Sequence, residues 1–296
     1  MMRASRIASL TALVLLGSAL AAHAQVRMRA TLDRSDYLLG EPVNLTVVIE
    51  NLTGNILDFG TKEDPQGSVY VEIFDSSGRL RSNYQRVNGS YAQANPMHGV
   101  KVAPGVRHVV DIPLDAFHDL SKEGDYEMRA YVTHKRMKFE FESRRLRFKI
   151  RRGKVEWQQY LGVPGAAADA PIQMREAKFI TMKAEEGIIA FFQVQDDDYI
   201  YATVRMGRMV LGSPTQVEID SRSQVHMLVA TQPRVIGYYV YDLNGKMKDN
   251  RFFEVATSVP RLEKDPDIGR VMVAGGKPMV RSERFDASEI EVMDMH

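Results

Sequence analysis

Residues 43–51 decide the fold, and they read Val43-Asn44-Leu45-Thr46-Val47-Val48-Ile49-Glu50-Asn51. Apolar side chains fall at every second position of this stretch. Because successive side chains of a strand point to opposite faces of a sheet, the spacing predicts a strand with one buried face. The same alternation recurs at 69–73, 128–132, 137–141 and 146–150. The N-terminal half is therefore predicted to be built from strands alone.

Turn-forming residues separate these segments. Gly40 precedes Pro42, Gly78 follows a short polar run, and Gly105 follows Pro104. About seven short strands at such spacing are typical of an antiparallel β-sandwich.

Two stretches carry a resemblance to a known family. The run Leu32-Asp33-Arg34-Ser35-Asp36-Tyr37-Leu38-Leu39-Gly40-Glu41-Pro42-Val43, with the strand after it, resembles the opening of bacterial immunoglobulin-like and macroglobulin-type β-sandwich domains. Gly124-Asp125-Tyr126 is similar to the tyrosine corner of such folds, where a buried Tyr bonds nearby backbone. The resemblance covers residues 26–152 and implies structural roles for Tyr37, Gly40 and Tyr126. It implies no single function, because this architecture serves adhesion, inhibition, enzyme docking and spacing.

The second half returns to short apolar segments and hairpin-like connections. They predict a second antiparallel β domain over 173–278, either a sandwich or a partly closed barrel, so the whole chain is expected to be all-β. Between the domains, a stretch rich in Gly, Ala and Pro predicts a linker or extended arm over 154–172, with Trp157 as its anchor. The acidic end, 279–296, is expected to be a flexible tail.

The N-terminus has the three parts of a cleavable secretory signal. Arg3 and Arg6 precede an apolar run from Ile7 to Ala22, and Ala24 ends a small-x-small triplet. We expect cleavage between Ala24 and Gln25 and a periplasmic or secreted protein. No later segment is apolar enough to span a membrane, so no transmembrane segment is expected. The chain contains no cysteine, which excludes disulfides and thiol chemistry.

A single strong run of basic residues interrupts an otherwise balanced charge. The net charge is +1, which gives no signature of nucleic-acid binding. Arg145, Arg147, Lys149 and Arg151 alternate with apolar residues and are predicted to line one exposed face of a strand. That face is either an edge strand protected by charge or a binding site for an acidic polymer or another envelope protein.

Candidate catalytic and metal-binding groups are few. Asp196, Asp197 and Asp198 form the densest carboxylate cluster, which could ligate calcium, but we favour a solvated hairpin turn. His118 lies between Asp115 and Asp119, where a general base is conceivable, but a solvated helical turn is favoured. The histidines lack zinc-ligand spacing, and phosphate loops and dinucleotide motifs are absent. We expect no catalytic residue, metal or cofactor.

Three functions remain open at this point. The first is a non-enzymatic exported protein whose sandwich serves as an interaction or spacing module. The second is a cell-envelope hydrolase or lyase with a catalytic second domain, because sites built from distant strands escape a search for motifs. The third is a macroglobulin-like protease inhibitor that presents the long loop from Ser82 to Gly99.

Overall fold

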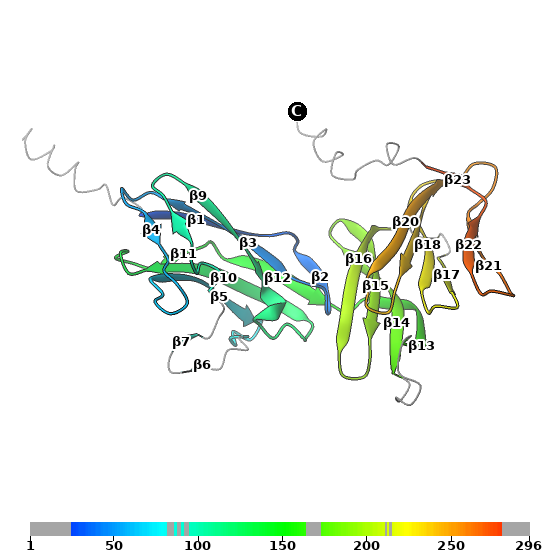
Figure 1. Cartoon of the computed structure of the whole chain (residues 1–296), viewed down its shortest axis with the longest axis horizontal. Coiled ribbons are helices and arrows are strands. Elements are labelled where there is room, and N and C mark those ends of the chain that lie inside the picture. Colours follow the sequence, from blue (N-terminus) through cyan, green and yellow to red (C-terminus); the bar gives the residue numbers. More distant parts are fainter. Residues whose placement is uncertain are drawn as a thin grey trace, which may run out of the picture. The chain divides into compact units, whose positions relative to one another are not determined.

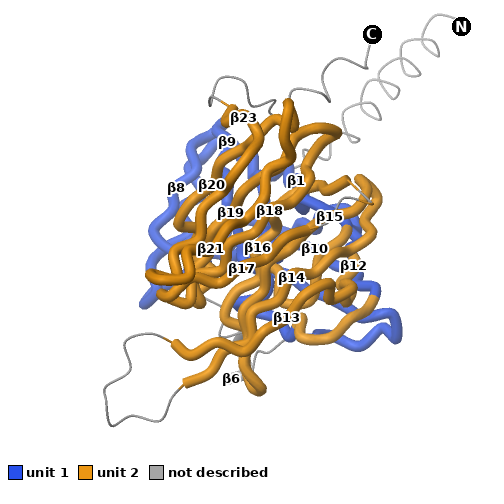
Figure 2. Tube along the Cα trace, turned by 90° about the vertical axis from the view of Figure 1, so that its right-hand side faces the viewer, with its two compact units in different colours: residues 1–35, 43–119, 125–148 blue, residues 36–42, 120–124, 149–296 orange. Residues whose placement is uncertain are grey.

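The computed structural model describes residues 25–81, 86–87, 90–91, 95–163, 173–210, 212 and 215–279. The predicted signal segment, residues 164–172 of the predicted linker and most of the predicted tail lie outside the described residues. Apart from one 3₁₀ turn, η1 (Leu114–Ala116), the described elements are strands, so the predicted all-β class is confirmed. The chain divides into two compact units (Figure 2). Unit 1 comprises 1–35, 43–119 and 125–148, and unit 2 comprises 36–42, 120–124 and 149–296.

Unit 1 contains two main layers of antiparallel strands (Figure 1). One sheet has the order β1 (Val26–Leu32), β3 (Asn44–Asn51), β9 (Arg107–Pro113). The other is built on β10 (Gly124–His134), which pairs with β5 (Gly67–Asp75), β11 (Phe141–Glu142) and β12 (Leu146–Arg151). The strand order of this sheet ends in β2 (Asp36–Leu38), which pairs in parallel with Lys149–Arg151 of β12. Both of these paired segments belong to unit 2. Two short pairs complete the strands: β4 (Leu57–Asp58) with β8 (Lys101–Val102), and β6 (Arg86–Val87) with β7 (Ser90–Tyr91).

The core of unit 1 follows the predicted alternation. Leu45, Val47 and Ile49 of β3 are fully buried, as are the alternate apolar residues of β10 from Met128 to Val132. Tyr126 is 3% exposed and stacks on Phe148 with ring centroids 5.3 Å apart. Burial of one face of each sheet supplies the main stabilisation of such a layered fold.

The alternation fails as a predictor at 137–141. Residues 135–140 form a turn, in which the Met137 amide donates to the His134 carbonyl at 2.8 Å, and a strand forms only at β11. Phe139 is 67% exposed, so the predicted half-buried strand is wrong here. The His134 ring also accepts the Arg136 amide at 3.0 Å, which helps to close the turn. Polar and apolar residues alternate here, but the chain reverses direction and no sheet covers the apolar side chains.

Unit 2 contains two antiparallel meanders. The first has the order β13 (Lys154–Gly162), β14 (Met174–Ala184), β15 (Gly187–Gln195), β16 (Ile200–Arg208). The second has the order β17 (Gln216–Ile219), β18 (Val225–Gln232), β19 (Val235–Tyr241), β20 (Met247–Glu254), β23 (Lys277–Pro278). A buried cluster unites residues of both sheets, among them Phe179, Phe192, Met227 and Tyr241. The two sheets are separate, share this cluster between them as the layers of a sandwich do, and form no closed barrel.

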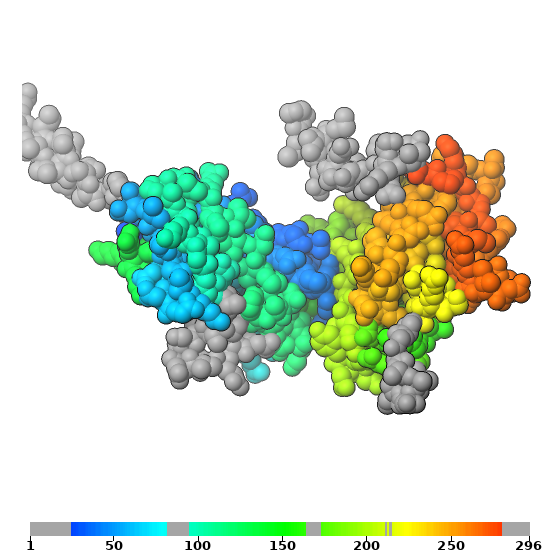
Figure 3. Space-filling view, viewed as in Figure 1, coloured from blue at the N-terminus to red at the C-terminus, as the bar shows by residue number. Residues whose placement is uncertain are grey.

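A hairpin covers the second meander on its other face. It consists of β21 (Arg261–Lys264) and β22 (Val271–Ala274), and Figure 3 shows it in orange to red at the surface of unit 2. Leu262 and Val273 of this hairpin pack on Leu228, Tyr238 and Val240.

The predicted linker is a strand over its first part. Residues 154–162 form β13, which pairs with β14 from Lys154↔Thr181 to Gly162↔Met174. Trp157 packs against the core between the two meanders instead of anchoring an arm. The Gly- and Pro-rich composition that suggested a linker begins only where this strand ends.

The segment 36–42, which the sequence assigns to the first domain, belongs to unit 2. Leu38 packs on Ile180 and Phe191. Gly40 has a φ of +83°, a backbone angle that favours glycine, and a Cβ there would lie 2.9 Å from Ile200 Cδ1. The conformation therefore supports a structural role for Gly40, within unit 2.

Candidate functional site

The outward positions of β5 and β10 in unit 1 carry a dense set of polar and aromatic side chains. They alternate with the buried residues of the same strands, so that one row faces the core and the other faces outward. The strand register places Tyr131 opposite Tyr70, Arg129 opposite Glu72, and Glu127 opposite Phe74. Arg145 and Arg147 join this row from the start of β12. We call these eight residues the outer face.

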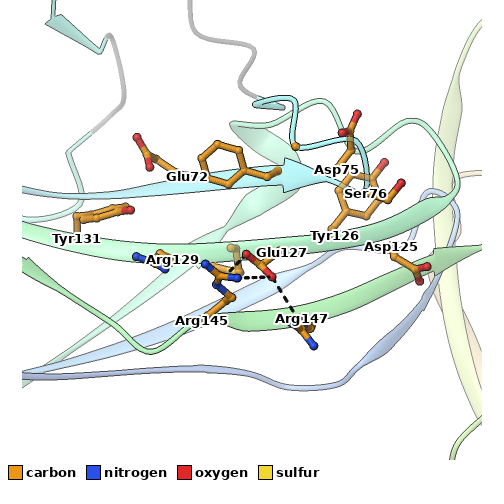
Figure 4. A pocket seen from close by; sticks show the side chains of 13 residues that line it. Glu72, Asp75, Ser76, Asp125, Tyr126, Glu127, Arg129, Tyr131, Arg145 and Arg147 are labelled. Carbon is orange, nitrogen blue, oxygen red and sulfur yellow. Dashed lines mark hydrogen bonds and ion pairs between the residues drawn. The ribbon is translucent and has the colours of Figure 1, made fainter.

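A shallow cavity of about 560 Å³ lies on the outer face (Figure 4). Its charged lining consists of four carboxylates and three guanidinium groups: Glu72, Asp75, Asp125, Glu127, Arg129, Arg145 and Arg147. The volume is within the range of small-ligand sites, roughly 300–1,000 Å³.

Glu127 lies between two arginines. Arg145 Nε is 2.8 Å from Glu127 Oε1, and Arg147 Nε is 3.4 Å from Glu127 Oε2. Figure 4 shows both guanidinium groups turned toward this carboxylate. The two positive charges are thus partly compensated within unit 1.

The remaining polar groups of the outer face are also paired. Arg129 Nη1 donates to Glu142 Oε2 at 2.7 Å, and this pairing raises the pKa of the guanidinium. Burial, together with a hydrogen bond to Glu72, raises the pKa of the Tyr131 phenol. These pairings orient the side chains before any ligand binds, which lowers the entropy lost on binding.

Two tyrosine rings stack on each other on the outer face. The rings of Tyr70 and Tyr131 stack with centroids 5.0 Å apart and an angle of 15° between their planes. The Tyr70 hydroxyl donates to Glu140 Oε2 at 2.7 Å. Burial first, and then this hydrogen bond, raise the pKa of Tyr70. Both rings are half-buried, so each offers an apolar face beside a fixed polar group.

Only part of the predicted basic face is exposed as expected. Arg145, Arg147 and Lys149 are exposed, whereas Arg151 is half-buried. Lys149 makes no ion pair with a described residue, but the first two arginines share Glu127. β12 pairs with β10 along one side, and β2 covers its other side only at Lys149–Arg151. The interpretation as a protected edge strand therefore fails for the second half of β12 only.

Sequence analysis missed Glu72, Glu127, Arg129 and the two tyrosines. The signal was present, because these residues occupy the positions between the apolar residues that predicted β5 and β10. Which of them meet across the sheet depends on the strand register, which a single sequence does not reveal.

The three aspartates lie in the connection between β15 and β16. Asp196 Oδ1 accepts the backbone amides of Asp198 and Tyr199 at 3.0 and 2.7 Å, and its other oxygen accepts the Tyr201 hydroxyl. These bonds, the one from Tyr201 foremost, lower the pKa of Asp196. Asp197 and Asp198 are exposed. Over the described residues, no group of three or more His, Asp or Glu side chains is arranged to hold a metal ion.

His118 is not solvated, contrary to the expectation from its acidic neighbours. It is 1% exposed, and its Nδ1 lies 3.1 Å from the Arg81 carbonyl. Asp115 accepts the Val43 amide at 3.1 Å. His118 is thus packed after η1, out of reach of a substrate in solution.

Two further observations concern the inhibitor alternative and the expected absence of a transmembrane segment. Much of the loop from Ser82 to Gly99, the proposed inhibitor loop, lies outside the described residues. Among the residues that the structure describes, no helix has the length and apolarity needed to cross a bilayer.

Comparisons with known proteins identify no family. No model of a protein family matches the chain, and no curated protein matches it. Among solved structures, the search found the crystal structure of Spo0M, sporulation control protein, from Bacillus subtilis. The two chains are 12% identical, and the match covers 62% of this chain and 90% of Spo0M with a TM-score of 0.26.

Proposed function

We propose that the protein is an exported, non-enzymatic binding module, and that its outer face binds a neutral, hydroxyl-rich polymer such as a glycan chain. The observation that carries this proposal is the arrangement of Arg145 and Arg147 around Glu127. In this proposal unit 1 is an immunoglobulin-like sandwich that displays the ligand site on one sheet.

The charges favour a neutral ligand over an acidic polymer. The lining carries four carboxylates against three guanidinium groups, so it has no excess of positive charge. An acidic polymer would have to displace Glu127 from two arginines and would meet Glu72 beside them. Like charges brought together in this way oppose binding.

The pattern of donors and acceptors suits hydroxyl groups. Carboxylates accept hydrogen bonds and guanidinium groups donate them, and a hydroxyl group can do both at once. The stacked rings of Tyr70 and Tyr131 supply an apolar surface for the C–H faces of a sugar ring. A shallow cavity open along the sheet can accommodate a chain.

Export supports this ligand class. A signal at residues 1–24 would deliver the protein to the periplasm or the medium, where envelope polysaccharides are abundant. A fold without cysteine is compatible with any redox conditions there.

The proposal is tested by measuring retention of the mature protein, residues 25–296, on immobilised neutral glucans and on anionic polygalacturonate. We expect retention on at least one neutral glucan, with little change between 50 and 500 mM salt, because neutral contacts are not screened. Retention on the anionic matrix alone, released by salt, would overturn the proposal in favour of the acidic-polymer function. Retention on neither matrix would also overturn it.

A further inference from the structure

Unit 2 contains a second cavity, independent of the outer face. It has a volume of about 880 Å³, and its apolar lining comes from both meanders: Trp157, Phe179, Met182, Ile188, Met209 and Val217. Phe179 also belongs to the core cluster between the meanders, and Trp157, Met209 and Val217 pack against that cluster, so the apolar lining is continuous with the core. An apolar surface in this position gains free energy when a ligand covers it.

Positive charge surrounds the cavity. Arg152, Lys154 and Lys183 line it, together with one carboxylate, Glu156. Lys154 Nζ is 2.8 Å from Glu156 Oε2, and the Thr181 hydroxyl donates to Glu156 Oε1 at 2.9 Å. Arg152 and Lys183 are exposed and form no ion pair with a described residue. Two positive charges therefore remain uncompensated beside an apolar interior.

We infer that this cavity binds a single-chain amphipathic anion, a fatty-acid-type carboxylate, with the chain against Trp157 and the carboxylate between Arg152 and Lys183. The volume falls within the range of small-ligand sites, roughly 300–1,000 Å³. Charge complementarity selects an anion and not a neutral or cationic chain. The apolar lining excludes small hydrophilic anions, which would leave the chain side of the cavity unfilled.

The sequence supplies a direct probe, because Trp157 is the only tryptophan of the chain. Dodecanoate, below its micelle concentration, is titrated into the mature protein while the emission of Trp157 is recorded. We expect a saturable shift of the emission to shorter wavelength, because the ligand replaces water around a half-buried indole. Dodecyltrimethylammonium, with the same chain and the opposite charge, is expected to give no saturable shift, and acetate none.

Charge variants locate the head group. Lys183→Gln and Arg152→Gln are each expected to weaken dodecanoate binding at least fivefold. The matched controls are Lys264→Gln and Arg270→Gln, which remove exposed charges elsewhere in unit 2 and are expected to leave the affinity within twofold. All four positions are exposed, so circular dichroism should show unchanged folding.

Three outcomes of these titrations would overturn the inference, and a fourth comes from vesicles. They are an emission unchanged by dodecanoate, an equal response to the cationic detergent, and equal weakening by the control substitutions. A response to anionic phospholipid vesicles without one to free dodecanoate would also overturn it, in favour of a membrane surface. Because the readout lies in unit 2, these results are separate from glycan binding at the outer face.

Discussion

His118 shows how burial changes the chemistry of a single residue. Its acidic neighbours in sequence suggest a solvated imidazole, but the ring is buried after η1. Burial lowers the pKa of His118 to about 4, from an ordinary value of 6.5. The folded protein therefore holds this imidazole neutral in a range of pH where the unfolded chain protonates it.

Because of this residue, we expect the free energy of unfolding to decrease as the pH is lowered. The stabilisation from the neutral, buried His118 is fully present above pH 6.5 and is lost as the pH decreases to about 4. The total loss in the free energy of unfolding is about 3 kcal/mol. We expect urea unfolding of the native protein to show this decline, and His118→Gln to show a smaller one. His226, whose pKa burial also lowers, leaves part of the slope in that variant.

The matched control is His108→Gln, on β9, where the side chain is half-buried. Parallel stability profiles of the native protein and His118→Gln between pH 7 and 4 would contradict the prediction.

At the scale of elements, alternation predicts strands well where a sheet buries one set of residues. It predicted β3, the inward row of β10, and β12. It failed at 137–141, where alternating residues line a reversal of the chain. The predicted linker began too early, at residues that form β13. The outer face could be anticipated only as two rows of polar residues, because its pairing depends on strand register.

The segment 36–42 is an element whose attachment the sequence does not predict. Arg205 Nε on β16 lies 2.7 Å from Glu41 Oε1, and both side chains are largely buried. Arg205 also donates to the Asp36 carbonyl at 2.8 Å, while Gln193 donates to the Leu39 carbonyl at 2.9 Å. These bonds tie the segment to the first meander of unit 2.

Breaking this ion pair should destabilise the protein. Glu41→Gln leaves a buried guanidinium whose charged partner among the described residues is Glu186 alone, and we expect a loss of about 3 kcal/mol in the free energy of unfolding. The matched control is Glu263→Gln, which breaks an exposed pair with Arg261 and should change stability by less than about 0.5 kcal/mol. Chemical denaturation measures both, and equal effects of the two substitutions would show that the pair does not hold the segment.

At the scale of the whole molecule, the net charge is only +1, although the two cavities described above differ in their balance of charge. The outer face of unit 1 balances carboxylates with guanidinium groups, whereas the cavity of unit 2 keeps two uncompensated positive charges. Composition averages over both, so the net charge indicates neither ligand. We propose that both cavities bind ligands, in line with the binding module proposed above.

The most direct test of the central claim is the affinity of outer-face variants for the neutral glucan that the native protein binds. Tyr131→Ala and Glu72→Gln are expected to weaken binding at least tenfold, about 1.4 kcal/mol each. Val109→Ala, which truncates an exposed side chain on the other sheet of unit 1, should bind as the native protein does. Calorimetric titration gives these affinities, and unchanged binding by the Tyr131 and Glu72 variants would contradict the account.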